Sequence, residues 1–174
     1  MSRGWFLFAL LGFVACGYTH TSARPDGELR RLHVAPIVDP ALHLDTGALV
    51  EEAVRRAIAR ESGVLLVGAT DADEILEVEL LSGTASLEAF AQPDRRAAQY
   101  RATVLVRGVL KRASGQVQWT SPPVSGDSAY LSTPGALESL DGAERRGLDR
   151  AAQQAAERLV LALVSHLRSS RSLP

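Results

Sequence analysis

The sequence 100-YRATVLVRGVLK-111 contains the clearest strand pattern in the chain. Successive side chains of a β-strand point to opposite faces of a sheet, so every second residue shares a face. One face of this segment carries Tyr100, Ala102, Val104, Val106, Gly108 and Leu110, and the other carries Arg101, Thr103, Arg107 and Lys111. The pattern predicts a strand with one buried face and one solvated, charged face.

The residues that follow predict a hairpin. Ala113-Ser114-Gly115 separates this strand from an alternating segment around Val117 and Trp119, as expected for a tight turn between antiparallel strands. Proline has no amide hydrogen to give to a sheet, so Pro122-Pro123 is expected to end or bulge the returning strand. The segment Val124–Leu131 is expected to resume it.

Two more strands are predicted upstream, because apolar and polar residues alternate there as well. The first runs through Leu32 and Val34, and the second runs from Ile75 to Leu81. In the second, Glu77 and Glu79 share the face that lies away from the apolar residues. The short apolar segment Val64–Val67 is expected to be a connection.

A first helix is predicted between the two upstream strands. It starts at Gly47, where the side chain of Asp45 or Thr46 can cap the free amides of the first turn, and Gly63 is a suitable stop. Its apolar face consists of Leu49, Val50, Ala53, Val54, Ala57 and Ile58, and its polar face carries the pairs Glu51 with Arg55 and Glu52 with Arg56, four residues apart.

The last predicted element is a long, alanine-rich helix from about Leu137 to Leu167, in which apolar residues recur at spacings of three and four. The predicted order is therefore strand, helix, three strands, helix. This order predicts a single α+β domain, a sheet of roughly four strands covered on one face by two helices. The domain is expected to span residues 29–168, and residues 169–174 are expected to be a frayed end.

The N-terminal residues predict a secreted lipoprotein. Trp5–Val14 is an apolar run after Arg3, too short to cross a bilayer, so residues 1–15 are expected to be a signal peptide. Ala15 precedes the only cysteine, Cys16, as in a lipobox, and acyl chains on that cysteine would hold the mature protein on a membrane. The alternative is an ordinary signal peptide with Cys16 as a small apolar residue. Residues 16–28 are expected to be a flexible tether.

The composition argues against several functions. The net charge is -1 in 174 residues, and loss of Arg3 with the leader leaves 18 basic against 20 acidic residues, or -2, so nucleic-acid binding through bulk charge is not expected. The four histidines have no metal-ligand spacing, and no nucleophile or phosphate-binding motif is present. We therefore expect no enzyme, no cofactor and no metal site. The carboxylates Asp71, Asp73 and Glu74 are best explained as a charged entrance to a strand.

Basic residues gather around the strand that opened this section: Arg95, Arg96, Arg101, Arg107, Lys111 and Arg112. Guanidinium groups bind phosphate or carboxylate through paired hydrogen bonds, so a ligand site is one explanation. The other is that these cations pair with Glu77 and Glu79 across neighbouring strands.

In order and spacing, several segments resemble the LptE family of lipopolysaccharide-assembly lipoproteins. They are Cys16-Gly17-Tyr18, the first helix, Ala85–Phe90, Ala98-Gln99-Tyr100 and Asp149-Arg150-Ala151-Ala152. The resemblance implies an outer-membrane lipoprotein on the periplasmic side, a plug and assembly factor for the β-barrel protein LptD, with lipopolysaccharide as the transported ligand. It also implies that Arg95 and Arg96 contact lipopolysaccharide. The second basic site of the family has no counterpart here, because no Lys or Arg occurs from Thr120 to Ala143.

Two other classes remain open from the sequence. The first is a lipoprotein adaptor of another envelope complex, such as a secretion or peptidoglycan-synthesis machine. Recovery with an inner-membrane or cell-wall enzyme, and not with a large barrel protein, would favour it. The second, an envelope hydrolase, is disfavoured because no motif places a nucleophile beside a base.

Overall fold

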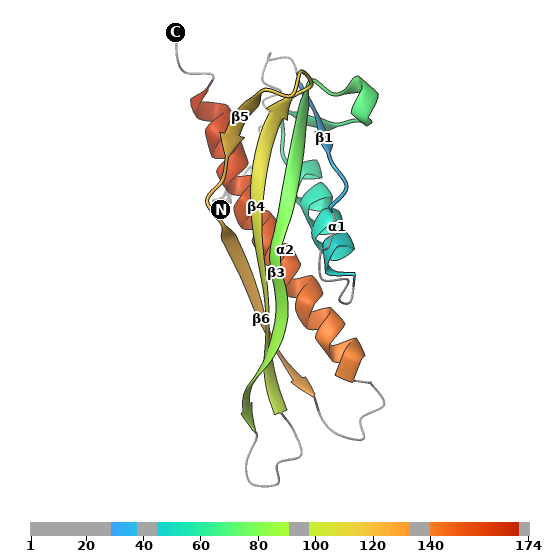
Figure 1. The fold of residues 1–174 in the computed structure, drawn as a ribbon, viewed down its shortest axis with the longest axis vertical. Coiled ribbons are helices and arrows are strands. Elements are labelled where there is room, and N and C mark those ends of the chain that lie inside the picture. Colours follow the sequence, from blue (N-terminus) through green and yellow to red (C-terminus); the bar gives the residue numbers. More distant parts are fainter. Residues whose placement is uncertain (1–28, 38–44, 91–97, 133–139, 171–174) are drawn as a thin grey trace, which may run out of the picture.

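The structure, a computed structural model, describes residues 29–37, 45–90, 98–132 and 140–170. Its centre is an open sheet of six strands, drawn in Figure 1. The strands are β1 (Arg30–Val34), β2 (Val64–Leu66), β3 (Glu74–Phe90), β4 (Ala98–Arg112), β5 (Val117–Thr120) and β6 (Val124–Ser132). The predicted α+β fold with two helices is confirmed. Two strands join the expected four, because Val64–Leu66 pairs with β1 and the segment after Pro122-Pro123 forms a strand of its own.

Strand β4 is the axis of the sheet. The strand order is β2-β1-β3-β4-β5, and β6 also pairs with β4. Strand β1 is parallel to β2 and β3, whereas β3, β5 and β6 are all antiparallel to β4. The predicted alternation in β4 is confirmed, because Ala102, Val104, Val106 and Leu110 are fully buried.

A single edge of β4 is covered by β5 and then by β6, with Pro122-Pro123 between them. At this break Ser121 takes over the pairing: its amide donates to the Gly108 carbonyl at 2.8 Å, and its Oγ accepts from the Gly108 amide at 2.9 Å. These two hydrogen bonds satisfy both backbone polar groups of Gly108 at the point where the prolines cannot donate. They matter because Ser121 is buried, away from water that could replace them. The predicted strand break is therefore bridged by a side chain.

Helix α1 (Thr46–Ala59) has the predicted buried face, with Val50, Val54 and Ile58 almost inaccessible. Both predicted ion pairs are present, Arg55 to Glu51 at 3.0 Å and Arg56 to Glu52 at 3.3 Å. The cap prediction for Asp45 is wrong. This residue is left-handed, with φ of 51°, and its side chain makes no cap hydrogen bond; its carboxylate lies 3.8 Å from Arg145.

Helix α2 (Leu140–Ser169) is long and packs closely on the sheet. Alanines Ala151, Ala152, Ala155 and Ala156 are fully buried and leave little space between the helix and the strands. At Gly126 of β6 a Cβ atom would lie 2.1 Å from the Ala151 carbonyl oxygen and 2.5 Å from the Ala155 amide nitrogen. The backbone of α2 therefore contacts the backbone of β6, which only glycine on the strand permits.

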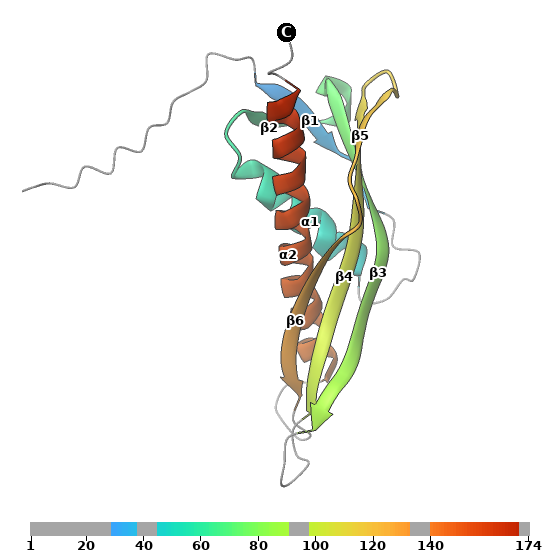
Figure 2. The ribbon, with the colours of Figure 1, turned by 90° about the vertical axis from the view of Figure 1, so that its left-hand side faces the viewer.

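Both helices cover the same face of the sheet, as Figure 2 shows from the side. We call the other face of β3, β4 and β6 the open face. The proximal end is the end where β1 begins and α2 ends, and the distal end is the end where β3 ends at Phe90 and β4 begins at Ala98. Within the described ranges, no helix has the length and apolar content needed to cross a bilayer.

Candidate functional site

Ion pairs run along the open face. Lys111 Nζ lies 2.6 Å from Glu77, and Arg107 lies 3.5 Å from Glu79 on the neighbouring strand. The alternative that these cations pair across strands is thus confirmed for Lys111 and Arg107. Glu79 lies directly opposite Arg107, and Glu77 reaches Lys111 diagonally, so this part of the open face is close to neutral.

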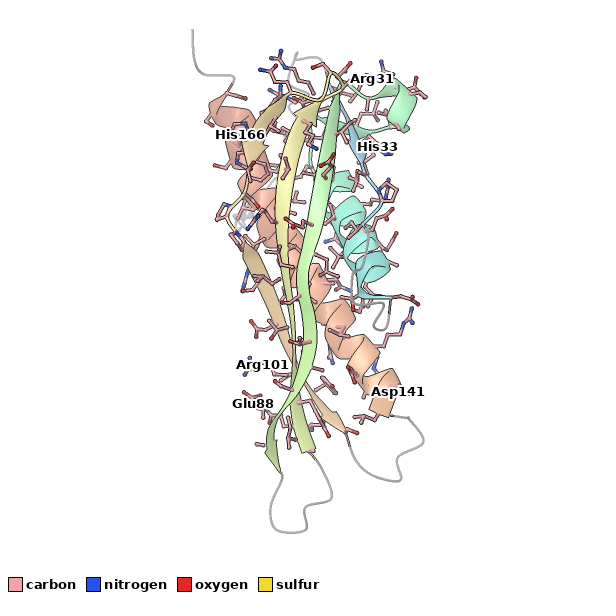
Figure 3. The ribbon with its side chains drawn as sticks, in the orientation of Figure 1. Arg31, His33, Glu88, Arg101, Asp141 and His166 are labelled. Carbon is pink, nitrogen blue, oxygen red and sulfur yellow. The ribbon has the colours of Figure 1, made fainter. Side chains whose placement is uncertain are left out.

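Arg101 joins three strands near the distal end. Its guanidinium donates to Glu88 of β3 at 2.6 Å and to Asp127 of β6 at 2.9 Å, and Gln99 also donates to Glu88 at 3.0 Å. Figure 3 shows Arg101 and Glu88 together on the lower part of the sheet. The hydrogen bond from Arg101, followed by that from Gln99, lowers the pKa of Glu88, and the same Glu88 raises the pKa of Arg101. We call these residues the Arg101 clamp.

The predicted site residues Cys16, Arg95 and Arg96 lie outside the described residues. The described residues on either side, Phe90 and Ala98, are paired across β3 and β4 at the distal end. The connection that carries the two arginines therefore starts and finishes at this end of the sheet.

A groove lies at the distal end, between the start of β4, the end of β6 and the first turns of α2. It encloses about 460 Å³ and is lined by Gln99, Ala129, Tyr130, Leu131, Ala143, Arg146 and Arg150. Arg146 and Arg150 are exposed and one helical turn apart, and Leu131 is 64% exposed. The groove therefore offers two cations beside apolar surface, a combination that suits an amphiphilic anion.

Two tyrosines form the floor of this region. The rings of Tyr100 and Tyr130 stack with centroids 5.4 Å apart. The Tyr130 hydroxyl is buried and finds no hydrogen-bond partner among the described residues. Burial, with the nearby carboxylate of Glu144 as a smaller cause, raises the pKa of Tyr130 to about 12. The phenol is therefore neutral at physiological pH.

The sequence prediction missed Arg146 and Arg150. A second basic site is expected between the last strand and the last helix, within residues 120–143, where neither arginine lies. The available signal was their spacing of four on one helix, which places both cations on one face. Only the contact of α2 with β4 and β6 brings that face beside Gln99.

Two of the histidines and two of the carboxylates have local partners in the described structure. His33 Nδ1 lies 3.2 Å from the Val67 carbonyl oxygen, and the His166 ring stacks on Trp119 at 5.8 Å (Figure 3). Asp71 lies 3.6 Å from Arg31, and Glu74 lies 2.8 Å from Arg30. Across the described parts of the chain, no three metal-binding side chains gather into a possible site. His20 and His43 lie outside those parts.

An open sheet with two helices on one face, paired charges on the other and a cationic groove at one end defines a class: a small α+β binding or assembly domain. The model of the LptE family, described as lipopolysaccharide-assembly, matches residues 29–163. This match spans most of the chain, and the chain belongs to the LptE family. Membership makes it a bacterial envelope lipoprotein of lipopolysaccharide assembly.

Solved structures show the same fold. A lipoprotein structure from Caulobacter crescentus is 17% identical, with a TM-score of 0.56 over 79% of this chain and 90% of that one. The hypothetical protein CT253 from Chlamydia trachomatis is 10% identical, with a TM-score of 0.53 over 81% and 98%. Protein XCC0632 from Xanthomonas campestris is 16% identical, with a TM-score of 0.53 over 85% and 93%. No curated protein sequence matches the chain.

Proposed function

We propose that this chain is an outer-membrane lipoprotein that plugs an LptD-like β-barrel and assists its assembly, so that lipopolysaccharide reaches the outer leaflet. Acyl chains on Cys16 would anchor it on the periplasmic side after removal of residues 1–15, residues 16–28 would form the tether, and the domain would extend over 29–168. The observation that carries the proposal is the family match over residues 29–163.

The open face supports the role of a plug. A surface that fills a water-lined barrel has to be polar, yet it must not bring unpaired charges against the wall. On the open face, Lys111 and Arg107 are already paired with carboxylates of β3. The face can therefore lie against a polar lumen without leaving these charges unpaired.

The distal end supports contact with lipopolysaccharide. Arg95 and Arg96 belong to the connection at this end, and Arg146 and Arg150 line the neighbouring groove. Guanidinium groups bind phosphates through paired hydrogen bonds, and the exposed Leu131 gives the same groove an apolar part. We infer that this end, and not the proximal end, contacts the phosphates of lipopolysaccharide. The role is one of binding and placement, without catalysis.

The test is depletion of the protein in its native cell, followed by a pull-down from outer membranes. We expect loss of surface lipopolysaccharide and recovery of one large barrel protein. A Cys16→Ser variant should leave the membrane fraction. Recovery of an inner-membrane or cell-wall enzyme, with surface lipopolysaccharide unchanged, would contradict the proposal and favour an adaptor of another envelope complex.

The site within the proposal is tested separately. The double variant Arg95→Gln, Arg96→Gln and the single variant Arg150→Gln should still recover the barrel but restore less surface lipopolysaccharide after depletion. Arg60→Gln is the matched control, because Arg60 is an exposed arginine directly after the end of α1 and its ion pair with Glu157 is a long one, at 3.6 Å. If all of these variants restored surface lipopolysaccharide equally, the distal end would not be the site that contacts it.

A further inference from the structure

A hollow in the described part of the chain lies at the proximal end, away from the distal groove. It encloses about 800 Å³, and its lining includes Arg30, Asp73, Glu74, Arg112, Gln118 and His166. These residues come from β1, β3, β4, β5 and α2 and from the residue before β3. Two guanidinium groups and two carboxylates line the same hollow, which we call the proximal pocket.

The central group of the proximal pocket is the carboxylate of Glu74. Glu74 is 8% exposed, and its Oε1 accepts a hydrogen bond from Arg30 at 2.8 Å. Its Oε2 is shielded from solvent and has no hydrogen-bond partner among the described residues. A buried carboxylate oxygen without a donor is costly, so this position favours a ligand that brings an N–H group.

A guanidinium group lies close to this carboxylate. With the Gln118 amide oriented to suit its neighbours, its nitrogen donates to Glu74 Oε1 at 2.9 Å and its oxygen accepts from Arg112 Nε at 2.7 Å. One carboxamide therefore separates the carboxylate from Arg112. Arg112 is exposed, so the rest of its guanidinium can receive an anionic group from the pocket.

We propose that the proximal pocket binds a zwitterionic phosphate ester of the phosphoethanolamine type, with the ammonium on Glu74 and the phosphate on Arg112. The proximal pocket has as many guanidinium groups as carboxylates. A simple anion or cation would upset this balance of charge, whereas a ligand that carries both charges keeps it. A primary ammonium supplies the N–H donor that Glu74 Oε2 lacks. A quaternary ammonium of equal charge does not.

The position of the pocket makes a phospholipid headgroup one source of such an ester. Leu29 lies on its lining and directly follows the tether. The 13 residue steps from Cys16 to Leu29 can span at most about 45 Å when extended, so an anchor on Cys16 would keep the pocket within that distance of the bilayer surface. A free phosphoethanolamine ester is the other source. The binding chemistry does not depend on the proposed barrel partner.

Trp119 provides the measurement, because its ring stacks on His166 of the pocket lining. The sequence has two tryptophans, and Trp5 belongs to the leader that the proposed processing removes, so Trp119 is the reporter in the mature chain. We expect soluble glycerophosphoethanolamine to change the Trp119 fluorescence saturably. Glycerophosphocholine should bind about tenfold more weakly or worse, since it has no N–H donor for a buried carboxylate. Equal binding of the two esters, or of glycerol phosphate alone, would overturn the proposal, as would no saturable change.

The source is decided by the same reporter in mixed micelles. Tighter binding of phosphatidylethanolamine than of glycerophosphoethanolamine identifies a membrane lipid, and equal binding identifies the free ester. Glu74→Gln should weaken both, and because it also alters a buried ion pair, Arg112→Gln serves as the second variant at an exposed residue. Glu79→Gln on the open face is the matched control. Unchanged affinity in Arg112→Gln would refute the assigned phosphate contact and the proposal with it.

Discussion

Gly126 is the residue at which the packing of α2 on the sheet tolerates least change. We expect Gly126→Ala to destabilise the domain by at least about 1–3 kcal/mol, the usual cost of an overpacked core, because the new Cβ would overlap the backbone of α2 at Ala151 and Ala155. Urea unfolding followed by circular dichroism measures the change. Gly68→Ala is the control, since nothing lies within 4 Å of a Cβ there. Equal stability of the two variants would mean that α2 lies further from β6.

Tyr130 carries a buried hydroxyl that has no hydrogen-bond partner among the described residues. Tyr130→Phe removes that group and keeps the ring stacked on Tyr100, so we expect the free energy of unfolding to rise by about 1 kcal/mol. The result to measure is the urea midpoint at pH 7. A lower midpoint in the variant would show that the hydroxyl has a partner.

The pH dependence of the same residue has a definite sign. The pKa of Tyr130 is raised in the folded state from 10.0 to about 12. Between these values the unfolded chain loses the phenol proton while the folded protein keeps it. The free energy of unfolding is therefore unaffected by this group below pH 10 and falls as the pH rises towards 12. The wild-type protein should therefore lose more stability than Tyr130→Phe over this interval. Parallel curves for the two proteins would contradict the shift.

The Arg101 clamp joins β3, β4 and β6 at the distal end, where these are the strands that pair. We expect Arg101→Gln to speed amide hydrogen exchange in the distal residues of β3 and β6 and to leave β1 unchanged. Lys111→Gln, which breaks a pair further up the open face, is the matched control. Faster exchange throughout the sheet in Arg101→Gln would mean that the clamp is not a local contact.

The clamp should also respond to acid. The pKa of Glu88 lies below its ordinary value of 4.5, so the stabilisation is present above that value and declines as the pH falls through the lowered pKa. Distal amide protection in the wild-type protein should approach that of Arg101→Gln at low pH. If the difference between the two proteins stayed constant with pH, Glu88 would not be the partner that matters.

The sequence predicted those elements whose two faces differ chemically. In β4 and at the start of β3, charged residues alternate with apolar ones, so the period of two is visible. The outer part of β3 is Ser82-Gly83-Thr84-Ala85-Ser86, whose small residues suit either face, and the full length of the strand was not predicted. Strand β2 has three residues and becomes a strand only through pairing with β1.

The same reasoning explains what was missed at the sites. Arg146 and Arg150 become part of a groove through the packing of α2, and the proximal pocket is assembled from residues as far apart as Arg30 and His166. Neither arrangement leaves a local motif. The resemblance to the LptE family came from the order of elements, which survives when individual residues diverge.

For the whole molecule, the two ends of the sheet have different chemistry. The distal groove combines cations with apolar surface, whereas the proximal pocket balances guanidinium groups against carboxylates. Under the proposed function the two ends would meet different ligands, lipopolysaccharide at the distal groove and a zwitterionic phosphate ester at the proximal pocket. The neutral ion pairs of the open face separate them.

The start of β1 and the end of α2 are neighbours, since Arg30 donates to Ser170 Oγ at 3.4 Å. A short linker could therefore join the natural ends, and the chain could be reopened in the connection 91–97. Such a circular permutant should melt near the wild-type temperature. With the lipobox attached to the new N-terminus, an acylated permutant would be anchored by the distal end of the sheet. Its activity would then show which end of the sheet has to face the membrane.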